Sequence, residues 1–334
     1  MNLNIINSLQ PQAIGDAISA FPLLWELSQA QRLFVYFSCT AVRPLCNFAT
    51  TSDEPLDGPI LDIQDFARAA QMRGLHLVQS WFWHFGMPIP QPPFEWPRLA
   101  TRLVSDHFDV AIAPFTRSEP ERAWPPRSLF SNVWPLANWT DLCHSSTRRV
   151  CLLCSAADDV SAFHHEGLHI LAGRDLPEVC GVLQNTGAVV TIDNGISWLA
   201  QAMRRPHVLL KSARHFGTWN SDLNPDAVNL ENSVGAATVL DRVDRLLEGR
   251  PLPVESTIPL DRKIARLALL NSAWFVAQRD HDAATASYRV WRQHATPAQV
   301  AVVAIEVLTA IGQLGVSGLR RWSSKRRVSA RSDR

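Results

Sequence analysis

Several motifs that would assign this 334-residue sequence to a well-defined enzyme class are missing. It contains no Walker phosphate loop, no G-x-G-x-x-G dinucleotide fingerprint and no nucleophile-elbow serine. The sequence therefore gives no support to a P-loop NTPase, a dinucleotide enzyme with that fingerprint, or a hydrolase built on such an elbow.

Cysteine is also sparse, and metal-ligand patterns are incomplete. Six cysteines spread over the chain do not form a disulfide framework and fit a reducing compartment. Cys151 and Cys154 have the spacing of half a zinc site, but no second pair matches it, and residues three apart on a strand point to opposite faces. His165 and His169 are separated by Gly167, so solvated loop histidines are favoured over metal ligands. We expect no bound metal.

Charge of either sign is limited. Charged residues make up 19% of the chain and the net charge is +1, which argues against a general nucleic-acid-binding protein. The N-terminus lacks the charged start and apolar core of a signal peptide, so we expect a cytoplasmic protein. The end of the chain, Arg320–Arg334, is strongly basic. Such a tail is usually a solvated, mobile segment, and the alternative is peripheral contact with the anionic inner membrane.

What the sequence does contain is a strand–turn–helix–strand pattern over residues 188–210. Residues 188–192 form a short β-branched apolar run, which is typical of a strand buried on both faces. Asp193, Asn194 and Gly195 are turn and helix-start residues, and the apolar residues after them recur with helical spacing. Such a turn can present backbone N–H groups to phosphate oxygens, although the turn alone favours the simpler interpretation that Asp193 or Asn194 is only a helix cap.

The same alternation of strands and helices extends over most of the chain. Further strands are expected at residues 3–6, 33–37, 60–63, 109–113, 150–154 and 168–171, whereas residues 44–59 are predicted to form a loop. This pattern predicts two α/β domains with parallel sheets, over residues 1–105 and 106–250. Residues 251–334 show only helical patterns and are predicted to form a helical tail with a basic end. The aromatic run Trp81–Phe85 is interpreted as core, with a sugar-stacking wall as the alternative.

Four separated segments resemble a known family. They are Gly15-Asp16-Ala17-Ile18-Ser19-Ala20-Phe21-Pro22, Arg122-Ala123-Trp124-Pro125, Leu171-Ala172-Gly173-Arg174-Asp175-Leu176, and Asp193-Asn194-Gly195 with Leu199-Ala200. In this order and spacing they resemble the heptosyltransferase-type glycosyltransferases of family 9. That family has the GT-B fold of two facing Rossmann-like domains. The chain departs from the family pattern by Trp198 in place of histidine, Asn194 in place of Thr or Ser, and Arg122 in place of Lys.

The resemblance implies a function and a set of site residues. A nucleotide-diphosphate sugar would be the donor, with no other cofactor. The acceptor would be a saccharide, glycolipid or protein on the N-terminal domain. Asp16 would act as the general base for inverting, metal-independent transfer. Donor-binding residues would be Gly15, Arg122, Asp193, Asn194, Gly195 and Lys211, with Arg214 as a further candidate cation.

Two other interpretations remain open. Asp16 could be only a carboxylate that stabilises the start of a helix. Trp198 favours a non-catalytic or remodelled GT-B protein that binds a nucleotide sugar or a partner. A sugar-nucleotide epimerase shares the fold, but it would need more acid and base groups than the sequence identifies.

Overall fold

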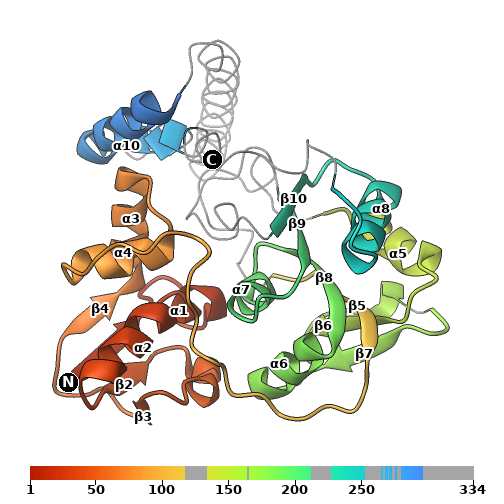
Figure 1. Cartoon of the computed structure of the whole chain (residues 1–334), viewed down its shortest axis with the longest axis horizontal. Coiled ribbons are helices and arrows are strands. Elements are labelled where there is room, and N and C mark those ends of the chain that lie inside the picture. The colour runs from red at the N-terminus through yellow and green to blue at the C-terminus, as the bar shows by residue number, and fades with distance from the viewer. Residues whose placement is uncertain are drawn as a thin grey trace, which may run out of the picture.

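The computed structural model describes residues 1–116, 134–163, 165–211, 227–252 and 280–295, together with residues 265, 268–269, 271–272 and 275–276. Its strands form two separate parallel sheets, one of four strands and one of six (Figure 1). The prediction of an α/β fold with two parallel sheets is thereby confirmed. No helix in the described ranges is long and apolar enough to cross a membrane.

The first sheet has the order β3-β2-β1-β4. Its strands are β1 (Asn2–Ile6), β2 (Phe34–Phe37), β3 (Thr50–Ser52) and β4 (Ile60–Asp62). The helices of this half are α1 (Ile14–Ile18), α2 (Phe21–Ala30), α3 (Ile63–Arg73), α4 (Leu77–His84) and the short 3-10 helix η1 (Thr40–Leu45). Trp81 and Phe82 of α4 are buried, so those two aromatic residues belong to the core. β3 lies inside the segment that the sequence predicted as a loop.

The second sheet has the order β10-β9-β8-β5-β6-β7. Its strands are β5 (Phe108–Ala113), β6 (Val150–Cys154), β7 (His169–Ala172), β8 (Thr186–Ile192), β9 (His207–Lys211) and β10 (Ala227–Glu231). The helices are α5 (Leu136–Ser145), α6 (Leu176–Gln184), α7 (Gly195–Ala202) and α8 (Ala236–Leu247), with the 3-10 turn η3 (Ser161–Phe163). In each sheet the order of strands reverses at one point, between β1 and β4 and between β5 and β8. Ligands of open α/β sheets bind at the carboxyl ends of the strands beside such reversals.

The chain between the sheets is anchored on the second half, and the helix near the C-terminus packs on the first half. Arg102 in the connecting segment donates its backbone N–H to Pro177 of α6 and pairs with Asp175. The helix α10 (His281–His294) packs on α3. There Arg68 pairs with Asp280 at 2.7 Å, and Asp280 also caps α10. The described part of the C-terminal region therefore lies against the first half of the chain.

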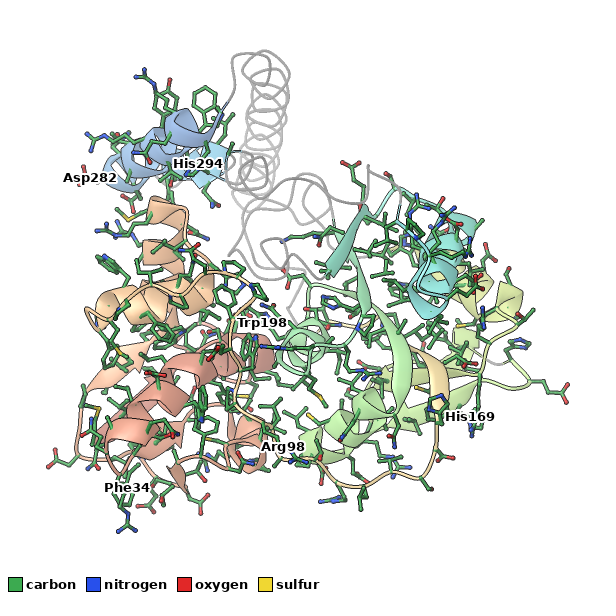
Figure 2. All side chains as sticks on the ribbon, in the orientation of Figure 1. Phe34, Arg98, His169, Trp198, Asp282 and His294 are labelled. Atoms are coloured by element: carbon green, nitrogen blue, oxygen red, sulfur yellow. The ribbon has the colours of Figure 1, made fainter. Side chains whose placement is uncertain are left out.

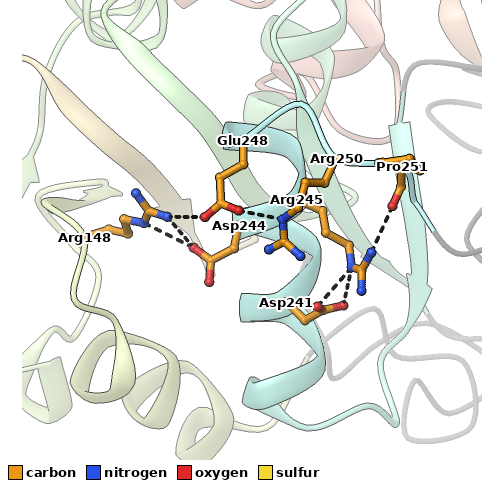
Figure 3. A network of polar contacts seen from close by, with 7 residues as sticks. All are labelled: Arg148, Asp241, Asp244, Arg245, Glu248, Arg250 and Pro251. Carbon is orange, nitrogen blue, oxygen red and sulfur yellow. Dashed lines mark hydrogen bonds and ion pairs between the residues drawn. The ribbon is translucent and has the colours of Figure 1, made fainter.

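A network of charged side chains holds α8 against the loop before β6 (Figure 3). The Nη2 of Arg148 lies 3.0 Å from Asp244 and 3.1 Å from Glu248, both on or just after α8. Arg245 closes the same helix end by donating to Asp241 and to the carbonyl of Pro251. All these side chains are partly exposed, so each pair contributes at most about 1 kcal/mol.

Candidate functional site

The candidate site lies where the reversal points of the two sheets approach each other. On the first sheet, Asn7 follows β1 directly and leads to α1. On the second sheet, the turn Asp193–Gly195 follows β8 and begins α7. Helices α1 and α7 are in direct contact. The segments that follow β1 and β8 leave the carboxyl ends of these strands, where open α/β sheets usually bind ligands. These two ends therefore meet at the contact between α1 and α7.

Asp16 lies in the first turn of α1, within electrostatic range of Asp193 in the turn before α7. Its Oδ2 accepts a hydrogen bond of 2.8 Å from Asn7 Nδ2. Burial, together with the negative charge of Asp193, raises the pKa of Asp16 to about 6, although the hydrogen bond from Asn7 opposes this shift. A carboxylate with such a pKa can accept a proton near neutral pH more readily than an ordinary aspartate.

Asp193 is paired with a buried lysine. The Nζ of Lys211, at the end of β9, lies 3.5 Å from Asp193 Oδ2, and both side chains are less than one-tenth exposed, at 6% and 7%. Adjacent parallel strands bring these residues together because β8 and β9 are neighbours and end side by side. One cation and two carboxylates, counting Asp16, are thus grouped at the junction of the two halves.

Asn194 is the N-cap of α7. Its Oδ1 accepts from the backbone N–H groups of Ile196 and Ser197, and its Nδ2 donates to the carbonyls of Ala113 and Phe115. The expectation that this turn presents free N–H groups is therefore wrong for residues 196 and 197, because the asparagine side chain already binds them. The contacts to Ala113 and Phe115 also fix the point from which the chain leaves β5.

Glycines allow the two helices to approach closely. A Cβ at Gly15 would lie 2.2 Å from Trp198 Cδ1, and a Cβ at Gly195 would lie 3.0 Å from the Cβ of Ile14. Trp198 is 2% exposed and lies at the junction of the two halves (Figure 2). Its ring centroid is 5.5 Å from that of His76 on the first half. The side chain that replaces the family histidine thus packs in the contact between the halves.

The predicted site residues are only partly covered by the structure. Arg122, Arg214 and the basic end of the chain lie outside the described residues. Gly15, Asp16, Asp193, Asn194, Gly195 and Lys211 all lie at the α1–α7 junction. Sequence reasoning missed Asn7, although a polar residue directly after a buried strand is a recognisable signal. Within the described ranges, no group of three His, Cys, Asp or Glu side chains could hold a metal ion.

Comparisons with known proteins point to one family. Residues 98–246 match the model described as "Glycosyltransferase family 9 (heptosyltransferase)". No curated protein matches the chain in sequence.

Solved structures share the fold at low sequence identity. A family 9 glycosyl transferase from Veillonella parvula is 9% identical, covers 74% of this chain and 97% of its own, and has a TM-score of 0.56. The E. coli heptosyltransferase WaaC, solved with ADP-2-deoxy-2-fluoro heptose, is 15% identical, covers 73% of this chain and 99% of its own, and has a TM-score of 0.50. The dodecameric iron-containing heptosyltransferase TibC of E. coli, solved with ADP-D-beta-D-heptose, is 14% identical over 88% of this chain and 76% of its own, with a TM-score of 0.45. The first two likenesses show the GT-B fold.

Proposed function

We propose that this chain is a heptosyltransferase-type glycosyltransferase that moves heptose or a related sugar from a nucleotide-diphosphate sugar to an acceptor hydroxyl with inversion. The match of residues 98–246 to the glycosyltransferase family 9 model supports this proposal. The acceptor is a saccharide, glycolipid or protein. The observation that carries the proposal is that Asp16, on the first half, lies within electrostatic range of Asp193, which pairs with Lys211 on the second half.

In the proposed reaction, Asp16 removes the proton of the acceptor hydroxyl as that oxygen attacks the anomeric carbon of the donor. The bond from this carbon to the diphosphate breaks on the opposite side, so the configuration inverts. The pKa of about 6 at Asp16 supports this role, because a base must be ionised at working pH and still bind a proton in the transition state. By this reasoning the first half binds the acceptor and the second half binds the donor.

The leaving diphosphate needs positive charge. Lys211 is the described cation beside the turn that begins α7, and the partial charge of the α7 N-terminus adds to it. Gly15, Asp193, Asn194 and Gly195 complete the proposed donor side. Asn194, the cap of α7, binds the carbonyl of Phe115, so Phe115 lies beside the start of α7. Arg122 follows Phe115 by seven residues in the sequence. We propose that Arg122 supplies the second cation.

We further propose that transfer is independent of metal and that Arg320–Arg334 places the protein at the cytoplasmic face of an anionic membrane. The first proposal rests on the sequence, which contains no complete metal-ligand pattern, and the second rests on the basic tail. Chelation with EDTA should leave turnover unchanged, and truncation after Leu319 should weaken binding to anionic vesicles. Loss of turnover that added iron or magnesium restores would contradict metal independence.

The central test measures nucleoside diphosphate release from a panel of nucleotide sugars that includes ADP-D-β-D-heptose, with and without saccharide acceptors. Parent protein should release the diphosphate in an acceptor-dependent way. Asp16→Asn should bind the donor with nearly unchanged affinity in calorimetry but lose transfer by at least about 100-fold, since the base acts on the acceptor. Unchanged turnover in Asp16→Asn would refute the role of Asp16.

A remodelled GT-B protein that binds a nucleotide sugar without transferring it is the alternative, and the buried Trp198 favours it. Trp198 packs against Gly15 of α1, so it occupies the contact between the halves beside Asp16. Donor binding without acceptor-dependent release, in every donor–acceptor pair of the panel, would favour this alternative. An epimerase would instead interconvert the donor sugar without any acceptor.

A further inference from the structure

We propose that Asn7 is a positioning residue of this site, which orients the Asp16 carboxylate, stabilises its negative charge and leaves Oδ1 of Asp16 for the acceptor hydroxyl. This inference rests on the proposed role of Asp16 as the base. It assigns a function to a residue that follows β1 at the reversal point of the first sheet.

Three donors fix the orientation of the Asn7 amide. Its Oδ1 accepts from the backbone N–H of Leu9 at 3.2 Å, from that of Gln10 at 2.8 Å and from Gln64 Nε2 at 2.9 Å. An amide nitrogen could not accept these three bonds, so the atom that receives them is the oxygen. The Nδ2 therefore has to face Asp16, to which it donates at 2.8 Å.

This arrangement distinguishes the two carboxylate oxygens of Asp16. Oδ2 is bound by Asn7, whereas Oδ1 accepts no hydrogen bond from the part of the chain that the structure describes. Asn7 itself is only 2% exposed, and its backbone N–H donates to Ser38 Oγ at 3.2 Å. The amide of Asn7 is therefore held rigidly by the first half of the molecule, and it contacts one oxygen of the Asp16 carboxylate.

The charges around Asp16 show why such a donor is needed. Asp193, on the second half, repels the ionised carboxylate of Asp16. Asp193 itself pairs with Lys211. The thiol of Cys39, after β2, also lies within electrostatic range of Asp16. Burial and Asp193 both favour the protonated acid, and the hydrogen bond from Asn7 favours the ionised base.

The experiment compares Asn7→Ala with Asn4→Ala in the full chain. Asn4 is a matched control because it is also 2% exposed and also bonds through its side chain, here to the carbonyls of Leu56 and Gly58 and not to Asp16. The carboxyl titration of Asp16 is followed by NMR of protein labelled with ¹³C-aspartate, in which Asp16→Asn identifies the signal. The acid limb of kcat/KM is measured in parallel with ADP-D-β-D-heptose and a saccharide acceptor.

We expect the Asp16 titration midpoint in Asn7→Ala to rise by about one pH unit, as for loss of a hydrogen bond to a charged group. The acid limb should rise with it, and kcat/KM at pH 6 should fall more than at pH 8. Asn4→Ala should leave both midpoints in place. Gln64→Leu, which removes one of the three donors to Asn7, should move them in the same direction by less.

An unchanged NMR midpoint in Asn7→Ala, or an equal rise in Asn4→Ala, would overturn the positioning role of Asn7. This conclusion would hold whatever the activity shows, because the NMR titration requires no substrate. A raised NMR midpoint with an unmoved acid limb would overturn the base role of Asp16 instead. The two failures are therefore distinguishable.

Discussion

Replacement of Asp16 by asparagine should stabilise the protein at neutral pH while abolishing transfer. The pKa of Asp16 is raised from 3.8 to about 6. A raised pKa means that the native state binds the proton more tightly than the unfolded chain does. The contribution of Asp16 to the free energy of unfolding is therefore highest below pH 3.8 and falls as the pH rises through 6.

The size of this effect follows from the shift. Each pH unit of pKa difference corresponds to about 1.4 kcal/mol, so the full contribution is at most about 3 kcal/mol. Between pH 4.5 and 7.5, where part of the titration has already occurred, the loss is at most about 2 kcal/mol. Asp16→Asn has no group to titrate, so its stability relative to the parent should rise by that amount over this range.

Urea unfolding of the parent and of Asp16→Asn at pH 4.5, 5.5, 6.5 and 7.5 measures this difference. Comparing the change with pH removes any constant cost of the new amide, including its altered contact with Asn7. Asp62→Asn is a control for pH-independent behaviour, because hydrogen bonds from Ser8 and Gln64 outweigh burial and hold the pKa of Asp62 below its usual value. Asp62 therefore titrates below the measured range, and the stability of Asp62→Asn relative to the parent should stay nearly constant from pH 4.5 to 7.5.

A stability difference between Asp16→Asn and the parent that does not change with pH would refute this reasoning. So would a parent that gains stability relative to Asp16→Asn between pH 4.5 and 7.5. In that case Asp16 would be a favourable helix-start carboxylate, and the expected loss of transfer would need another cause.

Three further changes test the junction and the tail. Gly15→Ala should destabilise the protein by about 1–3 kcal/mol because its Cβ would overlap Trp198, and Trp198→Ala should remove most of this extra cost in a double-mutant cycle followed by urea unfolding. Lys211→Met should lower the free energy of unfolding by about 3–5 kcal/mol, because it leaves the Asp193 carboxylate buried without that cation. Adding Asp193→Asn should restore much of the loss, and equal stability of the single and the double variant would contradict a buried pair. Asp280→Ala should cost about 1 kcal/mol in thermal unfolding through loss of the α10 cap, and a larger cost than Arg68→Ala is expected because the ion pair is exposed.

Local pattern was sufficient for most strands, including the edge strands β4 and β7, but not for β3 at the other edge of the first sheet. β1, β5, β6 and β8 are apolar runs that their sequence alone predicts as strands. β3 consists of Thr50, Thr51 and Ser52 and was predicted as loop, because a short polar segment carries no periodic signal. It is a strand only because β2 offers it a partner at the sheet edge.

The candidate site divides in the same way. Asp16, Gly15 and the Asp193–Gly195 turn were selected from sequence through their family resemblance, and the structure brings them together at the α1–α7 junction. The helix cap at Asn194 was one of the sequence-based alternatives, and the structure has it. Two other properties could not be derived from sequence. They are the pairing of Lys211 with Asp193 and the hydrogen bond from Asn7 to Asp16. Each depends on side-chain direction and on which strands are neighbours.

The sequence by itself thus determined the class of fold and the resemblance of residues 98–246 to glycosyltransferase family 9, because buried strands, helix starts and the spacing of motifs are local properties of the chain. The tertiary structure decided the electrostatics of the site. Asp16 and Asp193 belong to different sheets, and they influence each other only because glycines at positions 15 and 195 let α1 and α7 touch. Burial at that contact, which no local pattern encodes, is what raises the pKa of Asp16 toward neutrality.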